Sequence, residues 1–368
     1  MNYGPRIETV RDKMKKEDVT SLFVTNTTNV RYLCGFTGSN GSLLLGADGA
    51  HFFSDGRYKT QAGEQVEGAD VSIYGTPNEF GEGVRKQLGT EPSKVAFEAS
   101  HVSVLKSPQS GDGRPSLEEL ETHFEGHELV PSKGWVEDVR KVKDADELRL
   151  IKSAAELADA GFAHIVEQIE VGKTEHELAL DLEFFMRKSG ADGVSFELIV
   201  AAGERSALPH ARPTDKVVEK GRYLLFDLGC KLDGYCSDLT RTVIIGPADD
   251  RHREIYDLVL KAEEASLAEI RSGVTGVDID KIARDIISEA GYGEDFSHGL
   301  GHGVGLDVHE EPRLSRISTD TLQVGNVVTV EPGIYLAGWG GVRIEDLVFV
   351  GAEGPEVASA APKELMIL

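Results

Sequence analysis

The sequence is poor in cysteine and has no long apolar run. Its 368 residues include three cysteines, Cys34, Cys230 and Cys236, and these form no CxxC pair. Neither a disulfide scaffold nor a cysteine-rich zinc site is therefore expected, and the three thiols are predicted to be small buried apolar groups. No stretch approaches the roughly 18 apolar residues that a membrane span needs, and the first residues contain no apolar signal segment. We expect a cytoplasmic protein without membrane contact.

Positive charge is scarce relative to negative charge. The chain has 39 Lys and Arg against 63 Asp and Glu, which gives a formal net charge of −24. Such a surface repels a phosphate backbone, so nucleic acid is not an expected partner. The acidic residues are spread along the chain without a block of five or more, which is typical of a solubilising surface and not of a disordered acidic tail.

The length and the pattern of the chain indicate two domains. A chain of 368 residues that is 40% hydrophobic is too long for one ordinary core. Residues 1–135 alternate short apolar runs with helical stretches, the pattern of a small α/β domain. A turn-rich linker at 136–143 leads into an amphipathic helix that begins near Asp144. Its apolar residues at helical spacing are Leu148, Ile151, Ala155, Ala158 and Phe162. Residues 144–368 are the predicted second domain, and the fold class is α/β (α+β).

The second domain contains a weak internal repeat. Residues 172–191 match 273–292, and both segments have a threonine near the expected helix start and a glycine at its end. Further on, "LLFDLG" (224–229) matches "VTVEPG" (328–333), and each is followed by a second apolar strand that also carries an acid. The sequence therefore predicts two similar helix–helix–strand–strand halves that face each other.

Two carboxylates are expected on one face of the first hairpin. Asp233-Gly234 lies between two apolar alternations and is a strong signal for a two-residue turn. Such a turn puts Asp227 opposite Thr240, with Asp238 diagonally beside it at roughly 7 Å. Like charges among apolar neighbours are unfavourable unless a cation compensates them. An isolated hairpin could turn both acids to solvent, but the neighbouring residues are of core type, namely Phe226, Leu228, Leu239 and Val243.

The second hairpin supplies Glu331 and Glu345 in the same relation to its strands. Four acids from two related hairpins are explained more simply as one converging cluster than as independent surface residues. Such a cluster needs metal. Oxygen ligands with few nitrogens suit Mg, Mn, Co or Fe better than a cysteine-rich zinc site, and two ions roughly 3.5 Å apart would share carboxylates as bridges.

A glycine-rich segment, "SHGLGHGVGLDVHEEPR" (297–313), contains three histidines. It satisfies neither GxxxxGK[ST] nor GxGxxG, which excludes a phosphate loop. A plain turn would not need His298, His302 and His309. Glycines let the backbone approach a crowded centre closely, and one neutral imidazole can complete a metal's ligand set. His302 is the predicted ligand, His298 a pocket residue and His309 a proton or hydrogen-bond donor.

Five segments together resemble the pita-bread metallopeptidase family. They are "FDLG" with Asp227, "SDLTRT" with Asp238, "GHGVG" with His302, "EPGIY" with Glu331 and "RIED" with Glu345. They are similar to its proline-specific branch, the Xaa-Pro aminopeptidases (aminopeptidase P) and Xaa-Pro dipeptidases (prolidases). Residues 1–135 more weakly resemble the creatinase-like N-terminal domain of that family, through "YLCGFTGSNG" and "DGRY". The resemblance implies a pseudo-two-fold pita-bread catalytic domain and a smaller creatinase-like α/β domain.

The resemblance also implies a dinuclear metal site. Asp227 would bind one ion, His302 and Glu331 the other, and Asp238 with Glu345 would bridge the two. The expected metal is Mn, with Co, Zn or Fe as alternatives. The ions would lower the pKa of a water that attacks the carbonyl before proline, while Glu331 handles a proton.

Further residues are implied to face the substrate. His210 in "SALPHARP" and His309 match the pocket histidines of the family, which contact substrate and support the tetrahedral intermediate. Arg313 can hold a substrate carboxylate through its bidentate fork, or it can simply offset the neighbouring acids. Arg343 is expected to orient the bridging carboxylates, and Tyr335 either supports the site or packs.

The expected function is hydrolysis of the bond between an N-terminal residue and proline, by an Xaa-Pro aminopeptidase. "FTGSNG" and "DGRY" favour that activity, whereas Arg313 favours the alternative, an Xaa-Pro dipeptidase. A non-catalytic peptide-binding module is a more remote alternative, because no ligand position is missing. Methionine aminopeptidase is another, although it rarely carries such an N-terminal domain. Phe196 stands where some relatives of the family carry tyrosine, so the resemblance implies no specificity through that hydroxyl. Expected partners are short proline-containing peptides and a second copy of the chain.

Overall fold

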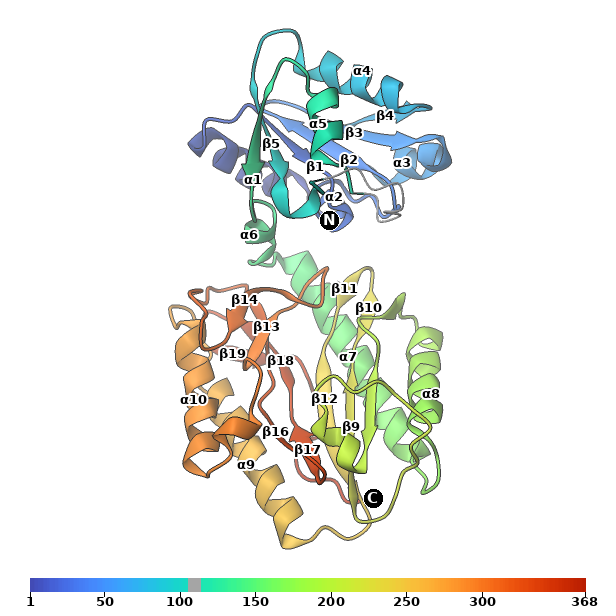
Figure 1. The fold of residues 1–368 in the computed structure, drawn as a ribbon, viewed down its shortest axis with the longest axis vertical. Helices are drawn as coiled ribbons and strands as arrows, with labels where there is room; N and C mark the ends of the chain where they lie inside the picture. Colours follow the sequence, from blue (N-terminus) through green and yellow to red (C-terminus); the bar gives the residue numbers. More distant parts are fainter. Residues whose placement is uncertain (105–113) are drawn as a thin grey trace. The chain divides into compact units, whose positions relative to one another are not determined.

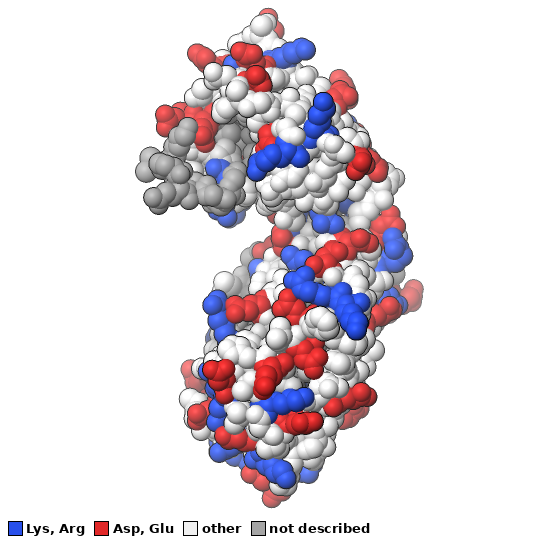
Figure 2. Space-filling view, turned by 90° about the vertical axis from the view of Figure 1, so that its right-hand side faces the viewer, with Lys and Arg blue, Asp and Glu red and all other residues white. Residues whose placement is uncertain are grey.

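The computed structural model describes residues 1–104 and 114–368, and the fold divides into two compact units, Met1–Arg140 and Lys141–Leu368. Among the described residues, no helix has the length and apolar character required to cross a bilayer. Figure 2 shows acidic and basic side chains interspersed on the face in view, as the spread of acids along the sequence predicts.

The first unit is an α/β domain built on one mixed sheet of six strands (Figure 1). The strand order is β4 (Asp70–Tyr74), β3 (Ala50–Asp55), β2 (Ser42–Gly46), β1 (Ser21–Val24), β5 (Lys94–Glu98) and β6 (Glu128–Ser132). The helices are α1 (Gly4–Lys16), α2 (Thr27–Cys34), α3 (Lys59–Gln65), α4 (Pro77–Leu88), α5 (Leu117–His123) and α6 (Glu137–Arg140). Phe23, Phe53 and Phe97 of the sheet pack with Val84 of α4 and Leu120 of α5 in one cluster of its buried apolar residues. The short helix α6 lies within the segment expected to be a linker.

The second unit has two halves of similar construction. In the first, α7 (Ala145–Gln168) and α8 (Glu175–Lys188) pack on a sheet of β12 (Leu239–Ile245), β9 (Arg222–Leu228) and β8 (Ile199–Ala202), beside β7 (Gly193–Val194), β10 (Cys230–Leu232) and β11 (Tyr235–Cys236). Asp144 caps α7 at the position expected from the sequence. Residues Ile151, Ala155, Ala158 and Phe162 are buried.

In the second half, α9 (Asp250–Leu267) and α10 (Gly276–Glu289) pack on β13 (Gly301–Gly303), β14 (Glu310–Leu314), β15 (Val327–Val330), β18 (Asp346–Val350) and β19 (Pro355–Val357). A two-stranded ribbon joins β16 (Gly333–Leu336) to β17 (Gly340–Arg343). Within this unit the two helix pairs lie on opposite outer sides, with the strands between them (Figure 1). A cluster of buried apolar residues lies beneath each helix pair.

The backbone confirms the internal repeat. Thr174 caps α8 and Thr275 caps α10, each through its side chain. Each threonine also forms a β-bridge, Thr174 to Val217 and Thr275 to Thr321. The matched glycines all adopt positive φ, which residues with a side chain rarely do: Gly172, Gly190, Gly273 and Gly291. The predicted pair of helix–helix–strand–strand halves is therefore correct.

The first hairpin has the predicted register. Asp233 and Gly234 both have positive φ, at 46° and 76°, which matches the tight turn expected for this pair. Leu232 pairs with Tyr235 between β10 and β11, and Asp227 pairs with Thr240 in the same register between β9 and β12 of the neighbouring sheet. All three cysteines are buried and free, as expected.

The second hairpin differs in detail from the expectation. Val330 pairs with Asp346 and Gly333 with Arg343, so the same register puts Glu331 directly opposite Glu345. The first hairpin instead offsets its two acids diagonally. Thr240 of the first hairpin forms an isolated β-bridge with Glu345 of the second, and this bridge joins the acid-bearing strands of the two halves.

Candidate metal centre

The second unit contains a cavity of about 480 Å³. Its lining includes every site residue predicted from the sequence except Tyr335, namely His210, Asp227, Asp238, His298, His302, His309, Arg313, Glu331, Arg343 and Glu345. These residues come from both halves and from segments far apart in the chain. The convergence of four acids from two related hairpins, predicted from the repeat, is thus seen in the folded chain.

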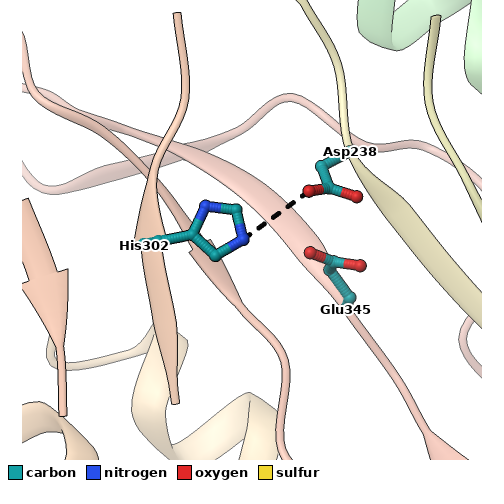
Figure 3. A group of neighbouring side chains, drawn as sticks. All are labelled: Asp238, His302 and Glu345. Atoms are coloured by element: carbon teal, nitrogen blue, oxygen red, sulfur yellow. Dashed lines mark ion pairs between the residues drawn. The ribbon is translucent and has the colours of Figure 1, made fainter. Parts of the chain in front are cut away.

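Asp238, His302 and Glu345 form the centre of the cluster. One ligand-type atom from each lies within 4.8 Å of the others, and all three residues are buried. Figure 3 shows the His302 ring directed at the Asp238 carboxylate, with the Glu345 carboxylate beside it. The distance from His302 Nε2 to Asp238 Oδ2 is 3.7 Å. Two carboxylates and one imidazole therefore point at a common centre.

Glu331 and Asp227 extend the cluster in different directions. Glu331 Oε1 lies 3.4 Å from His302 Nε2 and accepts a 3.4 Å hydrogen bond from the Thr329 hydroxyl. Asp227 Oδ2 accepts a hydrogen bond from Arg343 Nη2. Asp227 Oδ1 is buried and has no hydrogen-bond partner among the described residues. A buried carboxylate oxygen without a partner is costly unless something else compensates its charge.

Burial and the proximity of like charges dominate the electrostatics of the cluster. Burial, together with the neighbouring carboxylates, raises the pKa of Asp238 and of Glu345 well above the usual range. Burial raises the pKa of Glu331 to about 8, and it raises the pKa of Asp227 although Arg343 opposes the shift. Burial lowers the pKa of His302 to about 3, so its ring is neutral and able to coordinate.

The donors present fit divalent metal ions. Four carboxylates and one neutral imidazole make an oxygen-rich set, and Asp227 Oδ1 is the kind of unpartnered atom that a metal ligand presents in a protein without its ion. Further groups fix the donors: the Thr240 hydroxyl donates a 2.7 Å hydrogen bond to Glu345 Oε2, and the Thr329 hydroxyl accepts one of 3.0 Å from the His302 amide. Such supporting groups orient ligands and tune affinity.

His298, Tyr335 and Arg343 form one hydrogen-bonded group beside the carboxylates. The Tyr335 hydroxyl lies 2.8 Å from His298 Nε2 and accepts a 2.9 Å hydrogen bond from Arg343 Nη1. Arg343 Nε also donates to the Thr240 hydroxyl at 3.1 Å. Tyr335 does not line the cavity, so it contacts other site residues and not the cavity space. Burial lowers the pKa of His298 to about 4, which keeps this ring neutral as well.

His210, His309 and Arg313 lie on more open walls of the cavity. His210 and His309 are exposed, and the His309 ring packs edge-on against His302 with 4.4 Å between centroids. Burial and the nearby Arg313 lower the pKa of His309. Arg313 is 42% exposed, and its Nε lies 3.9 Å from Glu311 Oε1. An ion pair at this distance, exposed to solvent, is weak. The guanidinium is therefore available to another carboxylate.

The sequence did not indicate the supporting contacts of two threonines or the place of two further residues in the site. Thr240 and Thr329 contact the predicted ligands, and both lie two positions from an acid on the same strand face, a spacing that could have identified them. Glu197 and Arg212 also line the cavity and pair at 3.2 Å, but no motif singles them out.

A buried cluster of carboxylates and imidazole on a cavity wall is the arrangement of a metal-dependent hydrolase. Comparison with known proteins defines the family. Residues 149–352 match the model of metallopeptidase family M24, and residues 6–142 match the creatinase/prolidase N-terminal domain. The chain therefore belongs to metallopeptidase family M24, with a pita-bread catalytic domain and a creatinase-like N-terminal domain, and the resemblance seen in the sequence is confirmed.

Individual relatives match over nearly their whole length. An Xaa-Pro dipeptidase from Pyrococcus horikoshii is 33% identical over 365 residues, which is 98% of each protein. The solved structure of an Xaa-Pro dipeptidase from Bacillus anthracis is 40% identical, covers 100% of both chains and superposes with a TM-score of 0.91. That of an X-Pro aminopeptidase from Thermotoga maritima is 35% identical, covers 98% of this chain and 99% of its own, and gives a TM-score of 0.87.

Proposed function

We propose that this chain is a dinuclear-metal Xaa-Pro dipeptidase, which hydrolyses the peptide bond before proline in dipeptides. The observation that carries the proposal is the buried cluster of Asp238, His302 and Glu345 on the wall of a cavity that also presents Arg313. Relatives named Xaa-Pro dipeptidase, at 33% and 40% identity, support a dipeptidase over the aminopeptidase P activity expected from the "FTGSNG" and "DGRY" segments.

Five side chains would hold the metals. Asp227 would hold one ion, His302 and Glu331 would hold the other, and Asp238 and Glu345 would be shared between the two. When bound, the two ions, Mn²⁺ in preference to Co, Zn or Fe, supply Lewis-acid chemistry and make water a stronger acid. The unpartnered Oδ1 of Asp227 and the raised pKa values of the acids support this assignment.

The other site residues would bind the substrate and move protons. The carboxylate of Glu331 lies next to the His302 ring and takes the proton released during attack on the scissile carbonyl. His210 and His309 stand on the cavity wall, where they donate hydrogen bonds to the carbonyl oxygen as negative charge develops on it. His298 lines the pocket. Arg343, bonded to both Asp227 and Tyr335, keeps the ligand carboxylate oriented.

Arg313 supports the choice of dipeptides. In an Xaa-Pro dipeptide the proline carries the C-terminal carboxylate, and an arginine binds a carboxylate in bidentate fashion. The weak contact of Arg313 with Glu311 leaves that fork available. In a longer peptide the carboxylate lies further from the scissile bond and would gain less from this residue.

A direct test compares Leu-Pro with Leu-Pro-Gly as substrates of the purified protein loaded with Mn²⁺. The proposal expects the higher kcat/KM for the dipeptide. A clear preference for the tripeptide would favour the second candidate, aminopeptidase P, which the 35% identity to an X-Pro aminopeptidase supports. If both peptides stay intact with Mn²⁺ and with Co²⁺, the protein is no Xaa-Pro peptidase and a peptide-binding role becomes the better explanation.

We also propose the substrates, the oligomeric state and the compartment of the enzyme. Short proline-containing peptides are the substrates, and a homodimer in the cytoplasm is the working form. The buried free cysteines Cys34, Cys230 and Cys236 suit a reducing compartment. Sedimentation of the purified chain tests the dimer.

A further inference from the structure

The segment 203–214, between β8 and β9, carries His210 on the cavity wall. The His210 side chain is exposed, and within the part of the chain that the structure describes its ring makes no hydrogen bond. The ring therefore has no contact of this kind to fix its place. Its position depends on how the backbone of the segment is held.

Glu175, the first residue of α8, holds both ends of this segment. Its side chain is completely buried, and the residue does not line the cavity. Its Oε1 accepts a 2.7 Å hydrogen bond from the amide of Ala202. Its Oε2 accepts hydrogen bonds from the amide and the hydroxyl of Thr214, at 2.9 and 2.7 Å. One carboxylate thus joins the entrance of the segment to its exit.

Arg205 continues the connection to the residues next to His210. Its Nε donates to both oxygens of Glu175 at 3.0 Å, and its Nη2 donates to the carbonyl of Arg212 at 2.6 Å. On the other side of His210, the Pro209 carbonyl accepts a 3.2 Å hydrogen bond from Arg343 Nη1. Carbonyls on both sides of the histidine are therefore held by guanidinium groups.

The second half of the unit has a comparable device. Asp280 of α10 is buried, and its Oδ1 accepts a 3.1 Å hydrogen bond from the amide of Leu300. Arg284 pairs with Asp280 and donates to the carbonyls of Phe296 and His298 at 2.9 and 2.8 Å. In both halves a buried acid of the second helix and an arginine hold the backbone that carries a cavity histidine. Two occurrences in one fold argue against an incidental contact.

We propose that Glu175 and Arg205 are positioning residues that fix His210 at the cavity wall. The inference rests on the proposed function, because that function assigns His210 to the substrate. A buried carboxylate and its arginine cost desolvation energy, and a buried ion pair is by itself weak evidence of a role in stability. A displacement of a reacting group by about 1 Å can lower the reaction rate roughly 100-fold. Precise placement of His210 would explain why Glu175 and Arg205 form a buried pair at this position.

The first test is Glu175→Gln, which keeps the size of the side chain but replaces one acceptor oxygen with an amide donor, so that it faces a backbone N–H of Ala202 or Thr214 in either orientation. We expect kcat/KM for Leu-Pro to fall roughly 10- to 100-fold, with unchanged Mn²⁺ affinity in calorimetry. The matched control is Glu183→Gln on the same helix, where the carboxylate pairs with Arg187 at the surface. This control should leave both quantities unchanged. A parallel loss of Mn²⁺ affinity in Glu175→Gln would overturn the inference.

A double-mutant cycle separates positioning from general damage. In a His210→Ala background, Glu175→Gln should cost little more, because the residue that it positions is gone. An equal loss in both backgrounds would contradict the proposal. Arg205→Lys supplies a second variant: it keeps the charge but cannot reach Glu175 and the Arg212 carbonyl together. Activity of Arg205→Lys equal to that of the unaltered protein would also contradict it.

A spectroscopic readout keeps the inference independent of turnover. In protein with ¹⁵N-labelled histidine, the His210 ring signal is assigned by its loss in His210→Ala. Glu175→Gln should shift or broaden that signal and leave the others in place, whereas an unmoved His210 signal would refute positioning. If the unaltered protein cleaves no Xaa-Pro peptide, the proposed function fails, and the spectrum still decides whether Glu175 places His210.

Discussion

Thr240 and Glu345 join the two halves of the catalytic unit at the metal centre. They form a β-bridge, and the Thr240 hydroxyl donates a 2.7 Å hydrogen bond to Glu345 Oε2. The bridge lies at the meeting of two related hairpins. The position of Glu345, an expected bridging ligand, therefore depends on how the two halves pair.

Thr240→Val tests this relationship, because valine keeps the shape of threonine but removes the hydroxyl. Glu345 loses its donor and Arg343 Nε loses its acceptor. We expect Mn²⁺ affinity, measured by calorimetry, to fall roughly 10- to 100-fold, as is typical when a group that orients a ligand is lost. Thr20→Val, on the other unit, is the control, and equal affinities in the two variants would count against the role of the bridge.

Metal binding should depend on pH and release protons. Burial and the neighbouring carboxylates raise the pKa of Asp238 and Glu345 well above the usual range, and burial raises that of Glu331 to about 8, so Glu331 holds a proton near neutral pH without metal. Metal must displace that proton, so affinity rises as pH rises toward about 8. Calorimetry at pH 7 in buffers of different ionisation enthalpy measures the release. Heats that do not vary with the buffer would contradict the raised pKa values.

The same raised pKa values set the pH dependence of the metal-free fold. For Glu331 the folded state binds the proton more tightly than the unfolded state. Its contribution to stability is therefore present below the ordinary pKa of glutamate, near 4.5, and is lost as pH rises through about 8. The stabilisation given by metal should consequently grow over this interval.

A buried ion pair supports the strand that follows Glu345. Arg241 Nη2 lies 2.7 Å from Asp346 Oδ1, both side chains are 1% exposed, and Arg241 Nη1 donates to the Glu345 carbonyl at 2.5 Å. Arg241→Met would remove this partner of the Asp346 carboxylate, whose other oxygen lies 2.8 Å from Lys363 Nζ. We expect a loss of about 3–5 kcal/mol in the free energy of unfolding, measured with denaturant. Arg187→Met, at an exposed pair, should change it by less than about 1 kcal/mol.

Arg313→Ala tests the preference for dipeptides. If the guanidinium binds the proline carboxylate, its loss raises KM for Leu-Pro by roughly tenfold or more and changes kcat little. The KM for Leu-Pro-Gly should change less, because its carboxylate lies elsewhere. Steady-state kinetics with both peptides provide the comparison, and an equal effect on the two would remove Arg313 as the dipeptide determinant.

Local signals in the sequence were sufficient for much of the fold and the candidate site. Asp233 and Gly234 set the turn, and that turn fixed the register that puts Asp227 opposite Thr240. Alternation along the strands then located the acids on one face. Glycine and threonine caps similarly identified the repeated helices, because these residues satisfy local backbone requirements.

The remaining features of the site could not be predicted from the sequence, because they depend on contacts between segments that are far apart in the chain. The bridge from Thr240 to Glu345 and the bond from Arg343 to Asp227 each join residues of different halves. The burial of Tyr335 behind His298 and Arg343 follows from packing, so the sequence left its role open. Likewise, in the sequence Glu175 resembles an ordinary acid in the first turn of a helix. Its role follows from its hydrogen bonds to Ala202 and Thr214, which only the folded chain shows.

The metal content of the unaltered protein and of Asp238→Asn tests the central claim most directly. Elemental analysis after loading with Mn²⁺ should give two ions per chain for the former. Asp238→Asn should retain at most one ion and almost no hydrolysis of Leu-Pro, because a bridging carboxylate becomes a weaker, neutral ligand. An unaltered protein that binds no ion, or an Asp238→Asn variant with both ions and full turnover, would contradict the dinuclear assignment.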